Sequence, residues 1–290
     1  TRLLARTAGV LPAQFVVTLP KVHSPGEVEV LTRAVQDLEQ RLQLSPRSIR
    51  IELMVETPSV LSNREGRCWI PALQDACEGR CRGLHLGLYD FLSLMDVVSS
   101  AQSYLHPLAD HLRAVTKTAT AGSGVWLSDG ATNRIPVGPH RGERVTASQR
   151  NANRLSVHEG WREIFRHVDH SLRMGYYQGW DLHPSQFPPR YAAMFALFLR
   201  EETLAAARLR SFLDSTAQAT LRGQQFDDAA TGQGLLNFFL RGVACGALTE
   251  ASLLAAGLTK SELHTRSFEA IIEGRRSDQL SAMKSVIPIK

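Results

Sequence analysis

The sequence predicts an α/β fold built on a parallel sheet, followed by an all-helical region. Short apolar stretches rich in β-branched residues alternate with longer stretches in which apolar residues recur at helical spacing. No hairpin turn separates one apolar stretch from the next, so we expect parallel strands joined by helical crossovers. The alternation stops after Pro189, where the chain becomes rich in Ala, Leu and Arg.

Five strands are expected. They are Phe15–Leu19, Ile49–Val55, Gly83–Gly87, Gly124–Leu127 and Tyr176–Leu182. The helices expected between them are Pro25–Leu42, Pro71–Cys81, Leu105–Ala121 and Ala152–Met174, with a polar loop over Asn133–Arg150. Residues 1–190 therefore read as a β/α domain.

Residues 191–290 read as a helical extension that contributes to oligomerisation. The helices expected in it are Tyr191–Thr220, Leu235–Ala244, Glu250–Ala256 and Ser261–Glu273. Asp227 and Asp228 lie in the loop between the first two, where an acidic side chain caps the following helix or reaches a neighbouring chain.

Composition excludes several classes of protein. With 43% hydrophobic and 21% charged residues among 290, the chain is an ordinary globular protein rather than a disordered one. The apolar runs fall far short of the roughly 20 residues that cross a bilayer, so we expect a cytoplasmic protein without a membrane span. The net charge is +5, and the basic residues are scattered along the chain rather than gathered in one stripe. Nucleic acid is therefore not an expected partner.

Polar side chains gather at the carboxyl ends of the expected strands, where ligands bind in parallel α/β folds. They are Lys21, His23, Glu56, Asp90, Asp129, His183 and Gln186. An isolated acid at such a position more often caps the next helix. Glu56 and Asp90 differ because they follow successive apolar strands and can bring two carboxylates to one rim, as a hard divalent cation requires. Asp129 is the weaker partner, since Ser-Asp-Gly is also an ordinary turn.

Four short motifs occur in order at these strand ends. They are Pro20-Lys21-Val22, Val55-Glu56-Thr57, Gly87-Leu88-Tyr89-Asp90 and His183-Pro184-Ser185-Gln186. This series resembles the P-K-V, I-E-T, G-x-x-D and H-P-x-Q signatures of the citrate lyase β-subunit and HpcH/HpaI aldolase family. The resemblance covers roughly Phe15 to Tyr191. Each motif alone is weak, and the four in order are fairly specific.

The resemblance implies a (β/α)8 TIM barrel of the phosphoenolpyruvate/pyruvate type that lacks its first strands, since only five are found. It implies a carbon–carbon lyase or aldolase that acts on a 2-oxo acid or an acyl-CoA substrate and works as a homo-oligomer. Glu56 and Asp90 would bind Mg²⁺, or Mn²⁺ or Co²⁺. The backbone N–H groups of Gly87, Leu88 and Tyr89 would lie near the substrate carboxylate. Lys21 and His183 are the further candidates for binding the substrate.

The catalytic base and the exact function stay open. His23, His85 and His183 are candidates for the base by location only, and His85 is expected to be a packed histidine because Leu84 and Leu86 flank it. In the family the absent strands supply a substrate-binding Arg and, in the aldolases, a catalytic His. One alternative is a non-catalytic or truncated barrel subunit that needs a partner chain. Another is phosphoryl transfer linked to phosphoenolpyruvate on the same scaffold, without a phosphate-binding loop motif.

Overall fold

The computed structural model of the chain describes residues 2–142, 144–221 and 229–286. Asp227 and Asp228, the predicted helix caps, lie outside these ranges. The chain divides into two compact units, Thr1–Arg190 and Tyr191–Lys290. The first contains the sheet and is described before the second.

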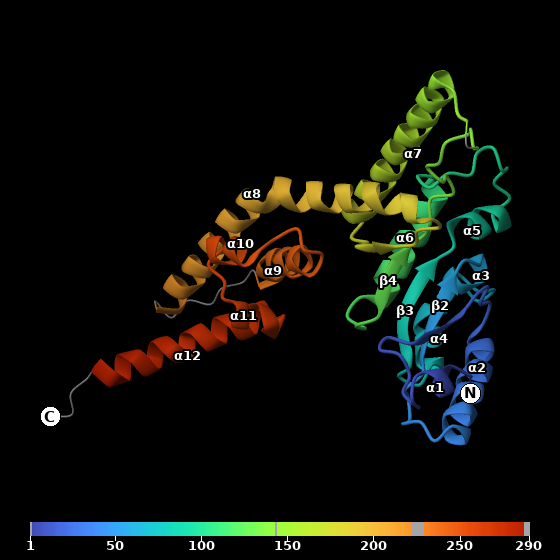
Figure 1. Cartoon of the computed structure of the whole chain (residues 1–290). Helices are drawn as coiled ribbons and strands as arrows, with labels where there is room; N and C mark the ends of the chain where they lie inside the picture. The colour runs from blue at the N-terminus through green and yellow to red at the C-terminus, as the bar shows by residue number, and fades with distance from the viewer. Residues whose placement is uncertain (1, 143, 222–228, 287–290) are drawn as a thin grey trace. The chain divides into compact units, whose positions relative to one another are not determined.

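Five strands form one parallel sheet in the first unit. They are β1 (Val16–Leu19), β2 (Arg50–Val55), β3 (Cys81–Leu86), β4 (Trp126–Asp129) and β5 (Gln178–Gly179). Each strand pairs with the next one along the chain, in the order β1-β2-β3-β4-β5, and Figure 1 shows β2, β3 and β4 side by side. The predicted parallel α/β fold is confirmed. The described strands leave β1 and β5 as open edges, so the closed barrel stays a prediction.

One helix precedes the sheet, other helices connect its strands, and a 3₁₀ turn follows β5. They are α1 (Arg2–Arg6), α2 (Pro25–Arg41), α3 (Pro58–Leu61), α4 (Ile70–Ala76), α5 (Leu88–Leu94), α6 (Pro107–Thr120) and α7 (Ala147–Arg173), with a 3₁₀ turn, η1 (Pro184–Gln186). The longest, α7, begins five residues before the predicted start at Ala152 because Thr146 and Gln149 form a capping box. The short helices α3 and α5 begin just after β2 and β3, and this places them at one end of the sheet (Figure 1).

The predicted helix Pro71–Cys81 is wrong at its carboxyl end. Helix α4 stops at Ala76, and Cys81 is already the first residue of β3. Between them Glu78 and Gly79 adopt left-handed backbone conformations with φ of 51° and 76°. A helix cannot continue through such residues, so the chain turns into the next strand.

One face of the sheet carries the hydrophobic core of this unit. Alternate residues of the central strands are buried, such as Ile51, Leu53 and Val55 on β2. They form a single cluster with residues of the helices, among them Val28 of α2 and Leu112 of α6. Residues of the opposite parity, which include Glu52, Glu56 and His85, therefore point to the other face.

A buried ion pair fastens the helices to the edge of this core. Asp129, at the end of β4, accepts hydrogen bonds from Nε of Arg113 at 3.0 and 2.9 Å, from the Tyr104 hydroxyl at 2.8 Å and from the Ser171 hydroxyl at 2.5 Å. All four side chains are buried. Removing one member of such a pair leaves the other charge buried without a partner, which lowers the free energy of unfolding by about 3–5 kcal/mol. Asp129 thus joins β4 to α6 and α7, which corrects its assignment as a weaker partner of Glu56 and Asp90.

His167 of α7 extends this buried cluster as a neutral side chain. Its ring stacks on Tyr104 at 4.6 Å between centroids and shares a 2.9 Å hydrogen bond with Thr132. Burial, followed by the positive charges of Arg166 and Arg113, lowers the pKa of His167 to about 4. In the unfolded chain this histidine has a pKa near 6.5. Between the two pKa values the unfolded chain therefore binds a proton that the folded chain does not bind.

We expect His167→Asn to remove part of the acid sensitivity of this fold. The folded pKa of His167 lies below the unfolded value, so its contribution to stability is lost as pH falls from about 6.5 to about 4. Over that range the wild type should lose about 3 kcal/mol more unfolding free energy than the variant. Urea unfolding at stepped pH measures this difference. His158→Asn, on the exposed side of α7, is the control, and equal pH slopes for wild type and His167→Asn would contradict the expectation.

The second unit is helical. Its helices are α8 (Phe187–Leu221), which begins in the first unit, α9 (Ala229–Ala244), α10 (Glu250–Ala255), α11 (Lys260–Thr265) and α12 (Phe268–Val286). The predicted helix Ser261–Glu273 is two helices, because Arg266 takes a left-handed conformation with φ of 56°. Phe198, Phe239 and Phe268 are among its buried residues. Across the described ranges, no helix combines the length and apolar character that crossing a bilayer requires.

Candidate active site

Three of the predicted site residues meet at the carboxyl ends of β1, β2 and β3. Lys21 follows β1, Glu56 follows β2 directly, and Asp90 lies in the first turn of α5 after β3. The strands are parallel and paired in sequence order, so their carboxyl ends lie at one edge of the sheet. Lys21 contacts both acids, Glu56 through its backbone N–H and Asp90 through its ammonium, so the three residues form one cluster.

Glu56 is the buried centre of the cluster. Only 3% of the surface of this residue is exposed to solvent. Its Oε1 accepts a 2.6 Å hydrogen bond from the backbone N–H of Lys21. Lys21 presents this N–H from a left-handed conformation, φ 52°, which is strained for a residue with a side chain. One residue further, the Thr57 hydroxyl donates to the carbonyl of Val22 at 2.6 Å. The turn after β1 is therefore held against the end of β2 at two points.

Gly87 makes room for the Glu56 carboxylate. A Cβ atom at position 87 would collide with both the carboxylate and the Cβ of Glu56. Any side chain there would push Glu56 out of its place above the end of β3. The glycine of the G-x-x-D motif is thus explained by packing, without reference to a ligand.

Lys21 and Asp90 form the exposed part of the cluster. The Lys21 ammonium lies 2.6 Å from Oδ1 of Asp90, and the two side chains are 62% and 53% exposed. An ion pair this exposed contributes little stability. The hydrogen bond to Asp90 raises the pKa of Lys21, so the amine stays protonated. A protonated lysine can attract an anionic group, but it is not the free amine that a Schiff base requires.

Lys21 brings the two acidic groups close to each other, because each of them contacts this residue. Burial raises the pKa of Glu56, and the charge of Asp90 and a side-chain hydrogen bond with Asp90 raise it further. Two carboxylates in such contact repel each other when both are ionised, and a divalent cation between them would remove that repulsion. Mg²⁺ is commonly bound by one or two carboxylates together with waters and substrate oxygens, so this donor set fits it. Within the described ranges no cluster of three or more His, Cys, Asp and Glu side chains could hold a metal ion.

The three predicted backbone donors differ in their availability. The N–H of Gly87 donates to the carbonyl of Val55 at 3.1 Å, so it is already used in the sheet. Leu88 and Tyr89 occupy the first turn of α5, where the backbone N–H groups have no partner inside the helix. The Leu88 side chain is buried, and Gly130 leaves the space for it.

The His183 motif organises a loop. Nδ1 of His183 accepts a 3.1 Å hydrogen bond from the backbone N–H of Ser185 and caps η1. The buried Gln186 amide donates to the carbonyls of Thr132 and Arg134, both at 2.9 Å, and so ties the segment after β5 to the segment after β4. The hydrogen bonds described for His183 stay within this turn, and a role in binding substrate remains a prediction.

A second polar cluster lies on the same sheet face as Glu56. Nε1 of Trp180 donates to Nδ1 of His85 at 2.8 Å, and Nε2 of His85 lies 2.7 Å from Glu52. Because Nδ1 accepts, the proton is on Nε2 and donates to the Glu52 carboxylate. His85 is thus a hydrogen-bonded, half-buried histidine, close to the expectation from its flanking leucines. Glu52 and Trp180 were not anticipated, although Glu52 and Glu56 are an even number of residues apart on one strand and so share a face.

The other histidine considered as a base, His23, is exposed. Its backbone N–H donates to Glu27 at 2.9 Å, and its carbonyl lies 3.5 Å from the Ser59 hydroxyl. Its described contacts therefore hold the turn before α2. They do not distinguish His23 as a base.

The fold is that of a solved lyase. A crystal structure of a citrate lyase from Burkholderia xenovorans LB400 matches with a TM-score of 0.59 and 20% sequence identity, covering 89% of this chain and 71% of that one. CitE from Mycobacterium tuberculosis, crystallised with magnesium, acetoacetate and coenzyme A, matches with a TM-score of 0.45 and 17% identity, over 83% of this chain and 73% of that one. At 20% identity the first match shows a likeness of fold alone.

The family is defined by sequence. Residues 1–271 match the family model described as a domain of unknown function, DUF6986, and the chain belongs to that family. A comparison with curated proteins finds no match.

Gly87→Ala tests the packing at the centre of this cluster. The added methyl group collides with Glu56, so the variant should lose about 1–3 kcal/mol of unfolding free energy, as overpacked sites do. Gly26→Ala in α2 is the matched control, because a Cβ there meets only the Ser24 hydroxyl at 3.9 Å. Urea unfolding of both variants measures the effect. Equal stabilities of Gly87→Ala and Gly26→Ala would show that Glu56 does not occupy the space above Gly87.

Proposed function

We propose that the protein is a divalent-metal-dependent carbon–carbon lyase or aldolase that acts on a 2-oxo acid or an acyl-CoA substrate. The observation that carries the proposal is that Lys21 holds both acids at the carboxyl ends of parallel strands, with its backbone N–H 2.6 Å from the buried Glu56 carboxylate and its ammonium 2.6 Å from Asp90. The fold shared with a citrate lyase supports the same class of reaction. Both features agree with the resemblance of the sequence motifs to citrate lyase β-subunits and HpcH/HpaI aldolases.

In this proposal Glu56 and Asp90 bind the cation, with Mg²⁺, Mn²⁺ and Co²⁺ as candidates. The bound cation supplies Lewis-acid stabilisation of the negative charge that develops on the carbonyl oxygen when the adjacent carbon–carbon bond breaks. Glu56, fixed by the Lys21 N–H, keeps one carboxylate in place on the buried side. Asp90 provides the second from the exposed side, where a substrate has access.

The chain's own positive groups suit an anionic substrate. Lys21 carries an ammonium whose charge is retained by Asp90, and it lies on the exposed side of the cluster. The backbone N–H groups of Leu88 and Tyr89 lie in the first turn of α5, where the helix dipole favours a carboxylate. We assign these groups to binding and orienting the substrate carboxylate. His183 is a further candidate from the loop after β5. The catalytic base is left unassigned.

A second candidate function is that of a non-catalytic subunit that associates with a partner chain. In the described part of the chain, β1 and β5 are the edges of an open parallel sheet. Open edges present unpaired backbone groups that readily pair with other strands. This candidate predicts association without metal-dependent cleavage, so the two experiments that follow separate it from the lyase.

Divalent-cation binding should depend on both carboxylates. Glu56→Gln and Asp90→Asn are each expected to weaken Mn²⁺ affinity by at least about tenfold, as loss of a group that supports a metal site does. Protons compete with Mn²⁺ for the Glu56 carboxylate, whose pKa is raised. As the pH is lowered, the Mn²⁺ affinity of the wild type should therefore begin to fall at a higher pH than it would at a site built on a glutamate of ordinary pKa. Titration calorimetry between pH 5 and pH 8 measures both effects.

Glu65→Gln is the control for this titration, because Glu65 is an exposed acid in a loop and pairs only with Arg67 among the described residues. It should bind Mn²⁺ as the wild type does. If Glu56→Gln and Asp90→Asn bind Mn²⁺ with unchanged affinity, the proposed metal site is wrong.

Cleavage of a carbon–carbon bond is the test of the reaction class. With saturating Mg²⁺ or Mn²⁺, the protein is expected to release pyruvate from 4-hydroxy-2-oxo acids or to cleave acyl-CoA thioesters. Chelation of the metal and Asp90→Asn should each abolish the activity, because both remove the stabilisation of the developing charge. A coupled assay for pyruvate and chromatography of the CoA products provide the measurement. Absence of cleavage of both substrate classes in metal-loaded protein would reject the lyase.

A further inference from the structure

Helix α7, the longest helix of the first unit, carries a row of basic side chains (Figure 1). The row consists of Arg150, Arg154, His158, Arg162 and Arg166, which follow one another at intervals of four residues and are all exposed. Residues four apart are neighbours on the surface of a helix, so the five side chains form one continuous ridge. At a rise of 1.5 Å per residue, this basic row is about 24 Å long.

The basic row lies on the side of α7 that is turned away from the core. The buried residues of this helix are Gly160, Ile164, His167, Val168, Ser171 and Leu172. With 3.6 residues per turn, they point about 160° away from the middle of the row. The core therefore holds α7 by one side and leaves the row facing solvent.

The acidic residues of α7 do not neutralise the row, because each of them pairs with an arginine outside it. Glu159 and Glu163 lie 3.2 and 3.5 Å from Arg134, and Asp169 lies 2.8 Å from Arg173. Among the residues that the structure describes, no carboxylate lies within ion-pair distance of the four arginines of the row. Their positive charges are therefore available to a ligand.

Most of the net charge of the chain is concentrated on α7 and the loop before it. Residues 134–166 contain seven arginines, three glutamates and no lysine or aspartate, which gives +4 of the total of +5. The rest of the chain is close to neutral. In the sequence these arginines look scattered because three residues separate each member of the row from the next, and only the helix brings them together.

The length of the row indicates a polymeric anion. A compact anion could reach one or two of the arginines, whereas a row about 24 Å long requires negative charge that repeats along the ligand. A nucleic acid carries a phosphate at every nucleotide, so it presents anions to the whole row in any register. Guanidinium groups bind phosphate oxygens through paired N–H donors. A basic stripe along a helix is the electrostatic pattern typical of nucleic-acid binding.

An anionic membrane suits this helix less well. A helix that lies on a membrane inserts its apolar face between the lipids. The apolar face of α7, with Ile164, Val168 and Leu172, is already buried in the first unit. A protein partner would need acidic residues at a spacing that matches the row, which a nucleic acid does not.

We propose that the basic row of α7 binds nucleic acid through its phosphates, without reading the base sequence. Arg150, Arg154, Arg162 and Arg166 each contact a phosphate in this arrangement. The proposal departs from the expectation drawn from the sequence, because the row is continuous only on the surface of the helix. It is a second function, and it does not depend on the lyase reaction or on the metal site.

Fluorescence anisotropy of the full chain with labelled DNA tests the binding. The probes are two duplexes of unrelated sequence, each about 20 base pairs long and thus longer than the row. We expect saturable binding of both duplexes with the same Kd, in the range of about 10⁻⁶ to 10⁻⁴ M that sequence-independent binding shows. The logarithm of the affinity should fall with the logarithm of the salt concentration with a slope of about −3 to −4, since four arginines displace counterions.

Arginine variants locate the binding on α7. The double variant Arg154→Gln, Arg162→Gln is expected to weaken binding at least about tenfold, since it removes two charge-assisted contacts. Its salt slope should be smaller by about two. The matched control is Arg41→Gln, Arg64→Gln, which removes the same charge from two exposed arginines outside the row and should bind as the wild type does. Circular dichroism establishes that each variant is folded, and the two single variants replace the double variant if it is not.

Three outcomes would overturn the proposal. The first is that neither duplex binds saturably at protein concentrations up to about 10⁻⁴ M. The second is that the control variant weakens binding as much as the variant of the row, which would indicate attraction by overall charge. The third is that polyglutamate displaces the labelled duplex as well as unlabelled duplex does, which would indicate an acidic protein segment as the partner.

Discussion

The contact between Lys21, Glu56 and Gly87 is the constraint on which the candidate site depends. Glu56 is buried, accepts the Lys21 N–H at 2.6 Å, and fits only because residue 87 has no side chain. These contacts join the ends of three neighbouring strands. They also fix one carboxylate of an acidic pair, while Asp90 stays accessible on the other side. A site with one fixed and one exposed acid can bind a cation and still admit a substrate.

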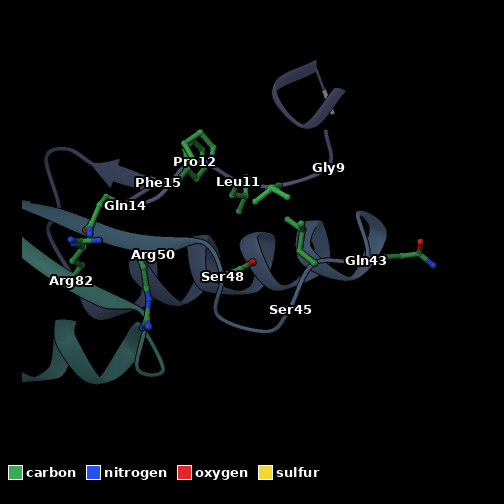
Figure 2. Close-up of a pocket in the computed structure, with 12 residues that line it drawn as sticks. Gly9, Leu11, Pro12, Gln14, Phe15, Gln43, Ser45, Ser48, Arg50 and Arg82 are labelled. Carbon is green, nitrogen blue, oxygen red and sulfur yellow. The ribbon is translucent and has the colours of Figure 1, made fainter. Parts of the chain in front are cut away.

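The two faces of the sheet differ in the side chains that they carry. One face packs against the helices and carries the core. The buried ion pair between Asp129 and Arg113 lies on the same side, at the carboxyl end of β4. The other face carries charged and polar side chains along the strands, with Glu56 at the carboxyl end and the Glu52–His85 pair below it. A pocket bordered by residues 9–15 and 43–48 lies at the amino end, where the strands begin (Figure 2).

Motifs that indicate chemistry in a sequence can also have a structural explanation. The glycine of the G-x-x-D motif is required by the Glu56 side chain, and Gln186 of the H-P-x-Q motif holds two carbonyls of the loop after β4. The described contacts of these two residues hold the backbone and Glu56 in place. Lys21 and Asp90, which are exposed and paired with each other, have no comparable packing role and are the stronger candidates for direct contact.

The sequence alone determined the parallel α/β fold, the helical second unit and the placing of Glu56 and Asp90 at neighbouring strand ends, because periodicity and strand order are local patterns. It did not determine that Asp129 turns to the helix side, or that Trp180 binds His85, a residue 95 positions away. Nor could it show the pocket at the amino ends of the strands, whose walls come from separate segments. Those features depend on which face a side chain takes and which distant segment lies opposite, and only tertiary packing decides both.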